Sequence, residues 1–250
     1  AMTAMTLNQL SQGRFIVGLG ASGPQVVEGW HGVAYGRPIT RTKEYITILR
    51  KIMAREGPVE HQGFHYSMPY QGEDGTGLGK ALKSILLADT SIPIFTASIT
   101  PAGLAASAEV ADGVFPIWMN PDRYDVFEAD ISKGLNKAGK TLLDFDIAPF
   151  VTCIMGDNVE HCRAPVKASM ALYIGGMGAR GANFYNDYTK KLGYEDAAVK
   201  IQDLYLAGKK DEAAAAVPDE LVDAVHLVGP KERIRERLQA WKAAAAKCHV

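Results

Sequence analysis

Three glycines near the start of the chain are spaced as in phosphate-binding turns. Gly18, Gly20 and Gly23 match the pattern GxGxxG, and residues 14–20 (RFIVGLG) have the composition of a buried parallel strand. In a dinucleotide-binding fold this spacing brings the backbone close to a pyrophosphate. The motif is therefore a candidate cofactor turn. The alternative is a plain tight turn, for which glycine is the default residue.

The residues around the motif argue against a nicotinamide dinucleotide site. That site needs a helix that begins inside the motif and an acidic residue about 20 positions later, at the end of a second strand. We expect neither, because Pro24 and a loop at 30–36 follow the glycines and Glu44 lies within a helical pattern. Loops at the carboxyl ends of parallel strands bind ligands in α/β folds. Glycines in such a loop permit close backbone approach to a flat ring or its side chain, so a functional role is favoured for the turn made of Gly20, Ala21, Ser22 and Gly23.

A second candidate cofactor segment precedes a predicted helix. Ser98, Ile99 and Thr100 stand between a predicted strand and Pro101, so a hydroxyl can cap the helix. The free N–H groups of the first helical turn can then face a phosphate. Plain N-capping without a ligand is the alternative.

A third candidate cofactor segment is a later glycine cluster, followed by Arg180. Its backbone N–H groups can form a nest around an anion, and the alternative is a break in a helix. The segment consists of Gly175, Gly176, Met177 and Gly178.

Four side chains are predicted to line the substrate. His31 follows Trp30 in the loop after the first strand, where an imidazole can donate to an oxygen or exchange protons near neutral pH. His31 is therefore the candidate catalytic group, and a plain surface histidine is the alternative. Trp118 and Asn120 end another predicted strand and complete the substrate-lining set.

The sequence does not indicate a metal site. His61 and His65 are four residues apart, but they lie in an irregular segment and not in a helix, where that spacing would place them on one face. The three cysteines, Cys153, Cys162 and Cys248, include no CxxC pair and are odd in number. We expect neither a disulfide framework nor a thiolate metal centre, and a reducing compartment, the cytoplasm, fits best.

Composition argues against several classes of partner. The 250 residues are 47% hydrophobic and 22% charged, which suffices for a large globular core. The 27 basic and 28 acidic residues give a net charge of −1, so no overall field attracts a nucleic acid or an anionic membrane. No run approaches the roughly 18 apolar residues of a membrane span, and the first residues lack the regions of a signal peptide.

Strands and helices alternate along the chain. The most distinct example is a strand, a helix and a second strand within 92–118, the pattern of a parallel crossover. Alternation predicts an α/β fold with a parallel sheet, either open or closed into a barrel. Predicted strands cover 14–20, 92–96, 114–118 and 145–154, and predicted helices cover 38–56, 101–111, 121–138 and a final segment that opens at Gly229-Pro230.

Two segments depart from the alternation. Residues 58–91 show no sustained period and are predicted to form a long irregular excursion. Residues 183–228 are predicted to be a helical insertion. The whole of 1–250 is nevertheless expected to be one domain.

The last segment carries two further expectations. Ile234, Leu238 and Trp241 share one helical face and are predicted to be core. Residues 247–250 resemble the first residues of a strand, and Ala1 opens inside a helical pattern, so both ends of the chain look like cuts.

The run from Leu7 to Gly20 (LNQLSQGRFIVGLG) closely resembles the signature of luciferase-like flavin and deazaflavin enzymes, where it leads through the fourth strand of a barrel. The resemblance covers nearly the whole chain. It departs from the family at Gln12, where SGGR is usual, and at Ser98-Ile99-Thr100, where relatives often have a glycine. Further segments look like the branch that uses the deazaflavin coenzyme F420: 22–32 (SGPQVVEGWHG), Arg41 with Glu44, 74–84 and 111–118 (ADGVFPIW).

The resemblance implies a (β/α)8 TIM barrel of the luciferase-like type, of which this chain holds about strands 4 to 7 and the start of strand 8. It implies hydride transfer between F420 and a small organic substrate, with a homodimer when full length. The catalytic acid or base is then expected in strands that precede Ala1, and cofactor binding by these 250 residues alone is expected to be weak. An FMN-dependent monooxygenase on the same barrel is one alternative, and a non-catalytic ligand-binding or interaction module is another.

Overall fold

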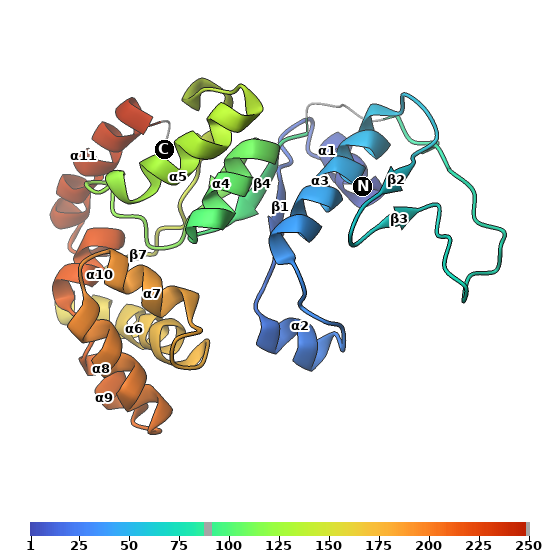
Figure 1. Ribbon diagram of the computed structural model, residues 1–250. Helices are drawn as coiled ribbons and strands as arrows, with labels where there is room; N and C mark the ends of the chain where they lie inside the picture. Colours follow the sequence, from blue (N-terminus) through green and yellow to red (C-terminus); the bar gives the residue numbers. More distant parts are fainter. Residues whose placement is uncertain (88–91, 249–250) are drawn as a thin grey trace. The chain divides into compact units, whose positions relative to one another are not determined.

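The computed structural model describes residues 1–87 and 92–248. Backbone contacts divide the chain into two compact units, each of which mixes helices and strands (Figure 1). The prediction of a single domain is not tested by this division and remains a prediction. Unit 1 comprises Ala1–Ser98, Ala102–Val114 and Ser132–Phe145, and unit 2 comprises Ile99–Pro101, Phe115–Ile131 and Asp146–Val250.

Unit 1 is an α/β assembly around parallel strands. Strands β1 and β4 pair in parallel with Gly20 opposite Ala97, and β5 lies on the other side of β4. The core beneath them is apolar and includes Met5, Ile46 and Ile94. The elements are α1 (Met2–Leu10), β1 (Val17–Gly20), α2 (Pro24–Trp30), α3 (Pro38–Ala54), β2 (His61–Gln62), β3 (Ser67–Met68), β4 (Ile94–Ala97), nearly all of α4 (Pro101–Val110), most of β5 (Gly113–Phe115), the second half of α5 (Asp125–Ala138) and a 3-10 turn (Leu142–Asp144).

Helix α3 shows why local sequence rules work well in unit 1. Pro38 occupies the first turn, where its missing N–H costs nothing, and Arg55 ends the helix with a left-handed φ of 51°. Ile46, Leu49 and Met53 are buried on one face. The predicted helix 38–56 is confirmed to within two residues.

The predicted crossover is confirmed, with shorter strands. Its first strand begins at Ile94 and its second ends at Phe115, before the predicted Trp118. Pro116 explains the early end, because proline has no N–H for the ladder. The predicted helix at 121–138 begins only at Asp125, since Asn120 accepts hydrogen bonds from the N–H groups of Asp122 and Arg123 and forms a turn there.

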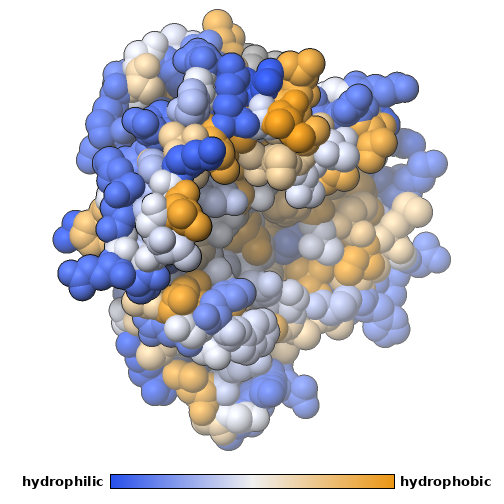
Figure 2. Space-filling model, turned by 90° about the vertical axis from the view of Figure 1, so that its right-hand side faces the viewer, coloured by the Kyte–Doolittle hydropathy of each residue, from blue (hydrophilic) through white to orange (hydrophobic). Residues whose placement is uncertain are grey.

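The excursion predicted at 58–91 contains little regular structure. Its only strands in the described part are β2 and β3, which form a two-residue antiparallel pair; residues 88–91 lie outside the described residues. Figure 2 shows apolar side chains gathered in patches between charged ones on the face it presents. The excursion itself carries exposed aliphatic side chains, namely Leu78, Leu82, Ile85 and Leu87.

Unit 2 consists mostly of helices around a second parallel pair. Strands β7 and β8 pair with Cys153 opposite Leu227 and Met155 opposite Gly229. Its elements are the first half of α5, β6 (Asp146–Ile147), β7 (Cys153–Met155), α6 (Val159–Ala171), a π-helical turn (Leu172–Gly176), α7 (Phe184–Lys191), α8 (Glu195–Leu206), α9 (Lys210–Ala215), α10 (Asp219–Val225), β8 (Leu227–Gly229) and α11 (Lys231–Cys248).

Three predicted boundaries in unit 2 are wrong. The strand predicted at 145–154 is two short strands, because Pro149 between them has no N–H for a ladder. The insertion predicted at 183–228 is helical only to Val225, and its last residues begin β8. The predicted strand at 247–250 is wrong at its first two positions, where α11 continues to Cys248; residues 249–250 lie outside the described residues.

The predicted core stripe of α11 is also wrong. Leu238 is 39% exposed, and Ile234 and Trp241 are only partly buried, whereas Ala244 is buried. The helical spacing was correctly recognised, but periodicity identifies a face without showing what covers it.

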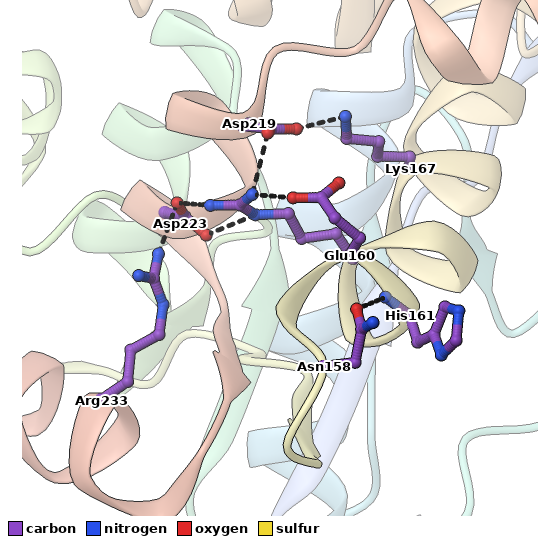
Figure 3. Close-up of polar contacts among 8 residues, drawn as sticks. Asn158, Glu160, His161, Lys167, Asp219, Asp223 and Arg233 are labelled. Carbon is purple, nitrogen blue, oxygen red and sulfur yellow. Dashed lines mark hydrogen bonds and ion pairs between the residues drawn. The ribbon is translucent and has the colours of Figure 1, made fainter.

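A network of ion pairs joins three helices of unit 2 (Figure 3). Arg163 on α6 binds Asp223 through two nitrogens, at 3.1 and 2.5 Å, and Asp219 at 2.8 Å. Arg233 on α11 reaches Asp223 at 2.6 Å, and Lys167 pairs with Asp219. The hydrogen bonds that the Arg163 guanidinium donates to Asp223 raise the pKa of Arg163. Because Arg163 is only 12% exposed, loss of either aspartate would leave a buried charge short of partners.

No helix in the described part of the chain is long and apolar enough to span a membrane.

Candidate functional site

The first glycine turn lies open at the carboxyl end of β1. Gly20 is exposed, and a Cβ placed on it would meet only the Cβ of Ala97, at an ordinary 3.8 Å. Because β1 and β4 are parallel with Gly20 opposite Ala97, the turn and Ser98 leave the sheet at the same edge. This edge is where parallel strands present ligand-binding loops.

A short helix follows the GxGxxG motif directly, in part of the segment where a loop was expected. Helix α2 starts at Pro24, with Gly23 as its N-cap residue. The predicted loop therefore starts later: Trp30 ends the helix and is 84% exposed, and His31 is its C-cap. Both remain accessible, as the substrate-lining prediction requires. The strand that pairs with β1 is β4, and the residue after it is Ser98, not an acidic residue.

The turn after Gly20 is held in a strained conformation. Ser22 has a φ of 57°, a left-handed value that costs energy for a residue with a side chain. The hydroxyl of Tyr35 donates to the carbonyl of Ser22 at 3.0 Å, and the N–H of Tyr35 donates to Glu28 at 3.1 Å. The loop after α2 thus folds back and fixes the backbone of the turn.

The second predicted segment is partly accessible. Ser98, Ile99 and Thr100 are each of intermediate exposure and connect β4 to α4. Their predicted role toward a phosphate is compatible with this placement and is not tested by it.

The glycines of the cluster at 175–178, in unit 2, are packed against other parts of the same chain. A Cβ on Gly175 or Gly176 would overlap Tyr205 on α8, and a Cβ on Gly178 would overlap the carbonyl oxygen of Ala182. Gly175 and Gly178 are buried, whereas Gly176 and Met177 are exposed. Arg180, the predicted anion partner, pairs with Asp203 at 2.8 Å. Close packing alone accounts for the three glycines, and the cluster ends a π-helical turn that continues α6.

Trp118 does not lie at an open mouth. It is 3% exposed, with its ring beside Tyr173 and Tyr185 at centroid distances of 6.0 and 5.8 Å. Asn120 is partly exposed, and its side-chain oxygen accepts from Arg237 at 3.2 Å.

Sequence reasoning missed the tyrosines and the asparagine that orients them. Tyr173 and Tyr185 are half-buried, and Asn183 between them is 1% exposed. The available signal was the asparagine immediately before the helical pattern of α7, which is a typical N-cap.

A partly buried carboxylate, that of Glu44, organises the excursion of unit 1. Glu44 accepts hydrogen bonds from the N–H groups of Phe64, His65 and Tyr66 at 2.8 to 3.0 Å and lies 3.5 Å from His61. Burial raises the pKa of this carboxyl, but the three N–H donors and His61 outweigh it and lower the pKa below its usual range. His61 and Glu44 thus pair with each other, and this pairing has a structural role. Within the described residues no group of three metal-ligating side chains comes together.

Residues 1–248 match the model of a family described as luciferase-like monooxygenase. The chain belongs to this family, and its predicted luciferase-like α/β fold is confirmed. It is 43% identical over 255 residues to a Mycobacterium tuberculosis protein named "Putative coenzyme F420-dependent oxidoreductase Rv3520c". The match covers all of this chain and 73% of that protein.

More distant relatives agree with this assignment. A 5,10-methylenetetrahydromethanopterin reductase of Archaeoglobus fulgidus is 25% identical over 242 residues, covering 93% of this chain and 65% of the reductase. The solved coenzyme F420-dependent tetrahydromethanopterin reductase of Methanopyrus kandleri superposes with a TM-score of 0.72 at 21% identity, covering 97% of this chain and 69% of that one. The latter likeness shows the fold alone.

Proposed function

We propose that this protein transfers a hydride between coenzyme F420 and a small organic substrate. The observation that carries the proposal is the open glycine turn at the shared edge of β1 and β4, in a chain of the luciferase-like family. The M. tuberculosis relative at 43% identity, whose name specifies F420 dependence, supports the choice of carrier.

The residues of unit 1 fit a flat cofactor. Gly20 is exposed and has no packing contact that needs glycine, so its missing side chain leaves space for a ligand. The strained Ser22 is consistent with a turn preorganised for binding, because such strain persists mainly at functional sites. When bound, the deazaflavin supplies the hydride chemistry, and the protein supplies position and electrostatics.

The predicted site residues differ in how well the structure supports a role in binding. Gly20, Ala21, Ser22 and Gly23 are assigned to the ring or its side chain, and Ser98, Ile99 and Thr100 to the phosphate end. His31 and Trp30 are accessible for the substrate, and His31 remains the candidate for proton exchange. The cluster at 175–178 has the weakest support, because internal packing explains its glycines.

Several coarser features complete the proposal. The substrate is a small molecule, and the net charge of −1 favours neither nucleic acid nor a membrane surface as partner. Three cysteines without a CxxC pair favour the cytoplasm, and the resemblance to the family favours a homodimer.

Calorimetric titration of the purified complete protein with F420 and, separately, with FMN tests the choice of carrier. We expect the protein to bind F420 more tightly than FMN and to exchange a hydride between F420 and a substrate. A protein that purifies yellow with FMN and does not bind F420 would instead be the monooxygenase alternative. If the complete protein is folded and binds neither cofactor, the result would support the non-catalytic alternative.

A further inference from the structure

Three aromatic rings converge in unit 2 where the chain leaves β5. Trp118 lies against Tyr173 and Tyr185, and the two tyrosines meet edge to face with a centroid distance of 4.8 Å. Trp118 is buried, whereas both tyrosines are partly exposed. The cluster therefore has a buried tryptophan and two partly exposed tyrosines.

Two unusual backbone conformations occur at this cluster. Trp118 has a φ of 52°, which is unfavourable for a bulky residue, and Tyr173 lies in the π-helical turn Leu172–Gly176. Strained residues and π-helical turns both concentrate at functional sites. The strain at Trp118 is held by a hydrogen bond from the buried hydroxyl of Tyr188 to its carbonyl, at 3.0 Å.

Asn183 fixes the two tyrosines relative to each other. Its side-chain nitrogen donates to the carbonyls of Tyr173 and Ile174, both at 3.0 Å. Its side-chain oxygen accepts from the N–H groups of Tyr185 and Asn186, at 3.0 and 3.2 Å. One buried amide thus ties the π-helical turn that carries Tyr173 to the start of the helix that carries Tyr185.

The phenol hydroxyls are available as hydrogen-bond donors. Within the part of the chain that the structure describes, neither the Tyr173 nor the Tyr185 oxygen has a hydrogen-bond partner. Burial, with a smaller effect of Tyr173, raises the pKa of the Tyr185 phenol, so Tyr185 is neutral near pH 7 and keeps its proton. Two hydroxyl groups beside aromatic faces suit a ligand with one oxygen on a flat apolar body.

We propose that Tyr173 and Tyr185, backed by Trp118, form a binding site for a planar or aromatic ketone, or the alcohol related to it, whose oxygen accepts hydrogen bonds from the two phenols. The site deepens the proposed function, because it names a class of substrate. It rests on the proposed function only in that the bound ligand is called a substrate. The rings provide the apolar contact, and the hydroxyls provide selectivity for the oxygen.

The test uses three probes of similar size. Acetophenone has the ring and the oxygen, ethylbenzene lacks the oxygen, and cyclohexyl methyl ketone lacks the aromatic ring. Calorimetric titrations are made with and without saturating oxidised F420. We expect acetophenone to bind most tightly, and Tyr173→Phe or Tyr185→Phe to weaken it about three- to tenfold, as the loss of one neutral hydrogen bond predicts.

The two phenylalanine variants keep the aromatic ring and remove only the hydroxyl, so they test the hydrogen bonds separately from the ring contacts. The same substitutions should leave ethylbenzene binding and F420 affinity unchanged, and Tyr194→Phe, a partly buried tyrosine at the start of α8, should leave acetophenone binding unchanged. The inference is overturned if acetophenone does not bind in either condition, or if both phenylalanine variants bind it as tightly as the parent. If acetophenone binds with this pattern while F420 does not bind, the proposed function fails and the site stands.

Discussion

The two glycine clusters look alike in sequence and differ in the structure. At 20–23 the glycine at the strand end is exposed and a side chain would fit. At 175–178 the glycines are mostly buried, and added side chains would overlap Tyr205 or the backbone of Ala182. The first cluster is free to approach a ligand, whereas the second lets helix α8 approach its neighbour.

The difference teaches that glycine content alone does not identify a cofactor loop. A missing Cβ leaves space, and only the surroundings decide whether a ligand or another part of the chain occupies it. Substitutions at the two clusters should therefore separate: one set should change affinity, and the other should change stability.

The largest effect is expected for Gly175→Ala. The new methyl group would overlap Tyr205, and overpacking of this kind costs about 1–3 kcal/mol of unfolding free energy. Urea unfolding measures the loss. Gly57→Ala is the matched control, because its Cβ would meet nothing within 4 Å. Equal stability of the two variants would contradict the packing explanation of the second cluster.

Asn183→Ala is expected to lower the unfolding free energy by slightly less than Gly175→Ala does. It removes the cap of α7 and the hydrogen bonds to the carbonyls of Tyr173 and Ile174, of which only the second keeps another side-chain donor, Asn186, at a cost of about 1–2 kcal/mol. Unfolding experiments measure the stability, and near-ultraviolet circular dichroism reports the packing of the neighbouring aromatic rings. Asn183→Asp keeps the capping oxygen and should lose less. A variant as stable as the parent would show that the π-helical turn does not need this amide.

Gly20→Val should behave in the opposite manner. The unfolding free energy should change little, because position 20 is open, while the affinity for F420 should fall about tenfold, or about 1.4 kcal/mol, as the side chain crowds the ligand. Gly20→Ala should give a smaller decrease. If Gly20→Val retains the parent affinity, the turn is not part of the cofactor site.

Tyr35→Phe is expected to have the smallest effect. It removes one exposed hydrogen bond to the carbonyl of Ser22, which contributes about 0.5–1 kcal/mol. The turn should lose some of its preorganisation, and the affinity for F420 should fall roughly twofold, or about 0.4 kcal/mol. A decrease larger than that of Gly20→Val would mean that loop folding, and not open space, governs binding at this turn.

Much of the fold could be predicted because its elements depend on local rules. Pro38 and the apolar spacing define α3, and the crossover at 92–118 was recognised from apolar runs on either side of a helix. Strand β8 was missed because three residues after a helix carry too little pattern, and the partner that makes them a strand, β7, lies more than 70 positions earlier. Strand lengths were overestimated where Pro116 and Pro149 end a ladder.

The candidate site was predicted only in part, for a related reason. The exposed turn at Gly20 follows directly from a strand ending in glycine, whereas the burial of Trp118 depends on Tyr173 and Tyr185, which are more than 50 positions away. No local pattern reports such contacts. The same limit explains the half-exposed Leu238, whose helical face was identified without knowledge of its neighbours.

The sequence by itself determined the family, the alternation of strands and helices, and the glycine turn after β1, because these depend on residue types and short spacings. Only the tertiary structure decided which glycines face open space, which of the aromatic residues converge, and that Asn183 joins the two tyrosine segments. The physical reason is that burial and side-chain contact are properties of pairs of residues distant in the chain, and they exist only once packing brings those residues together.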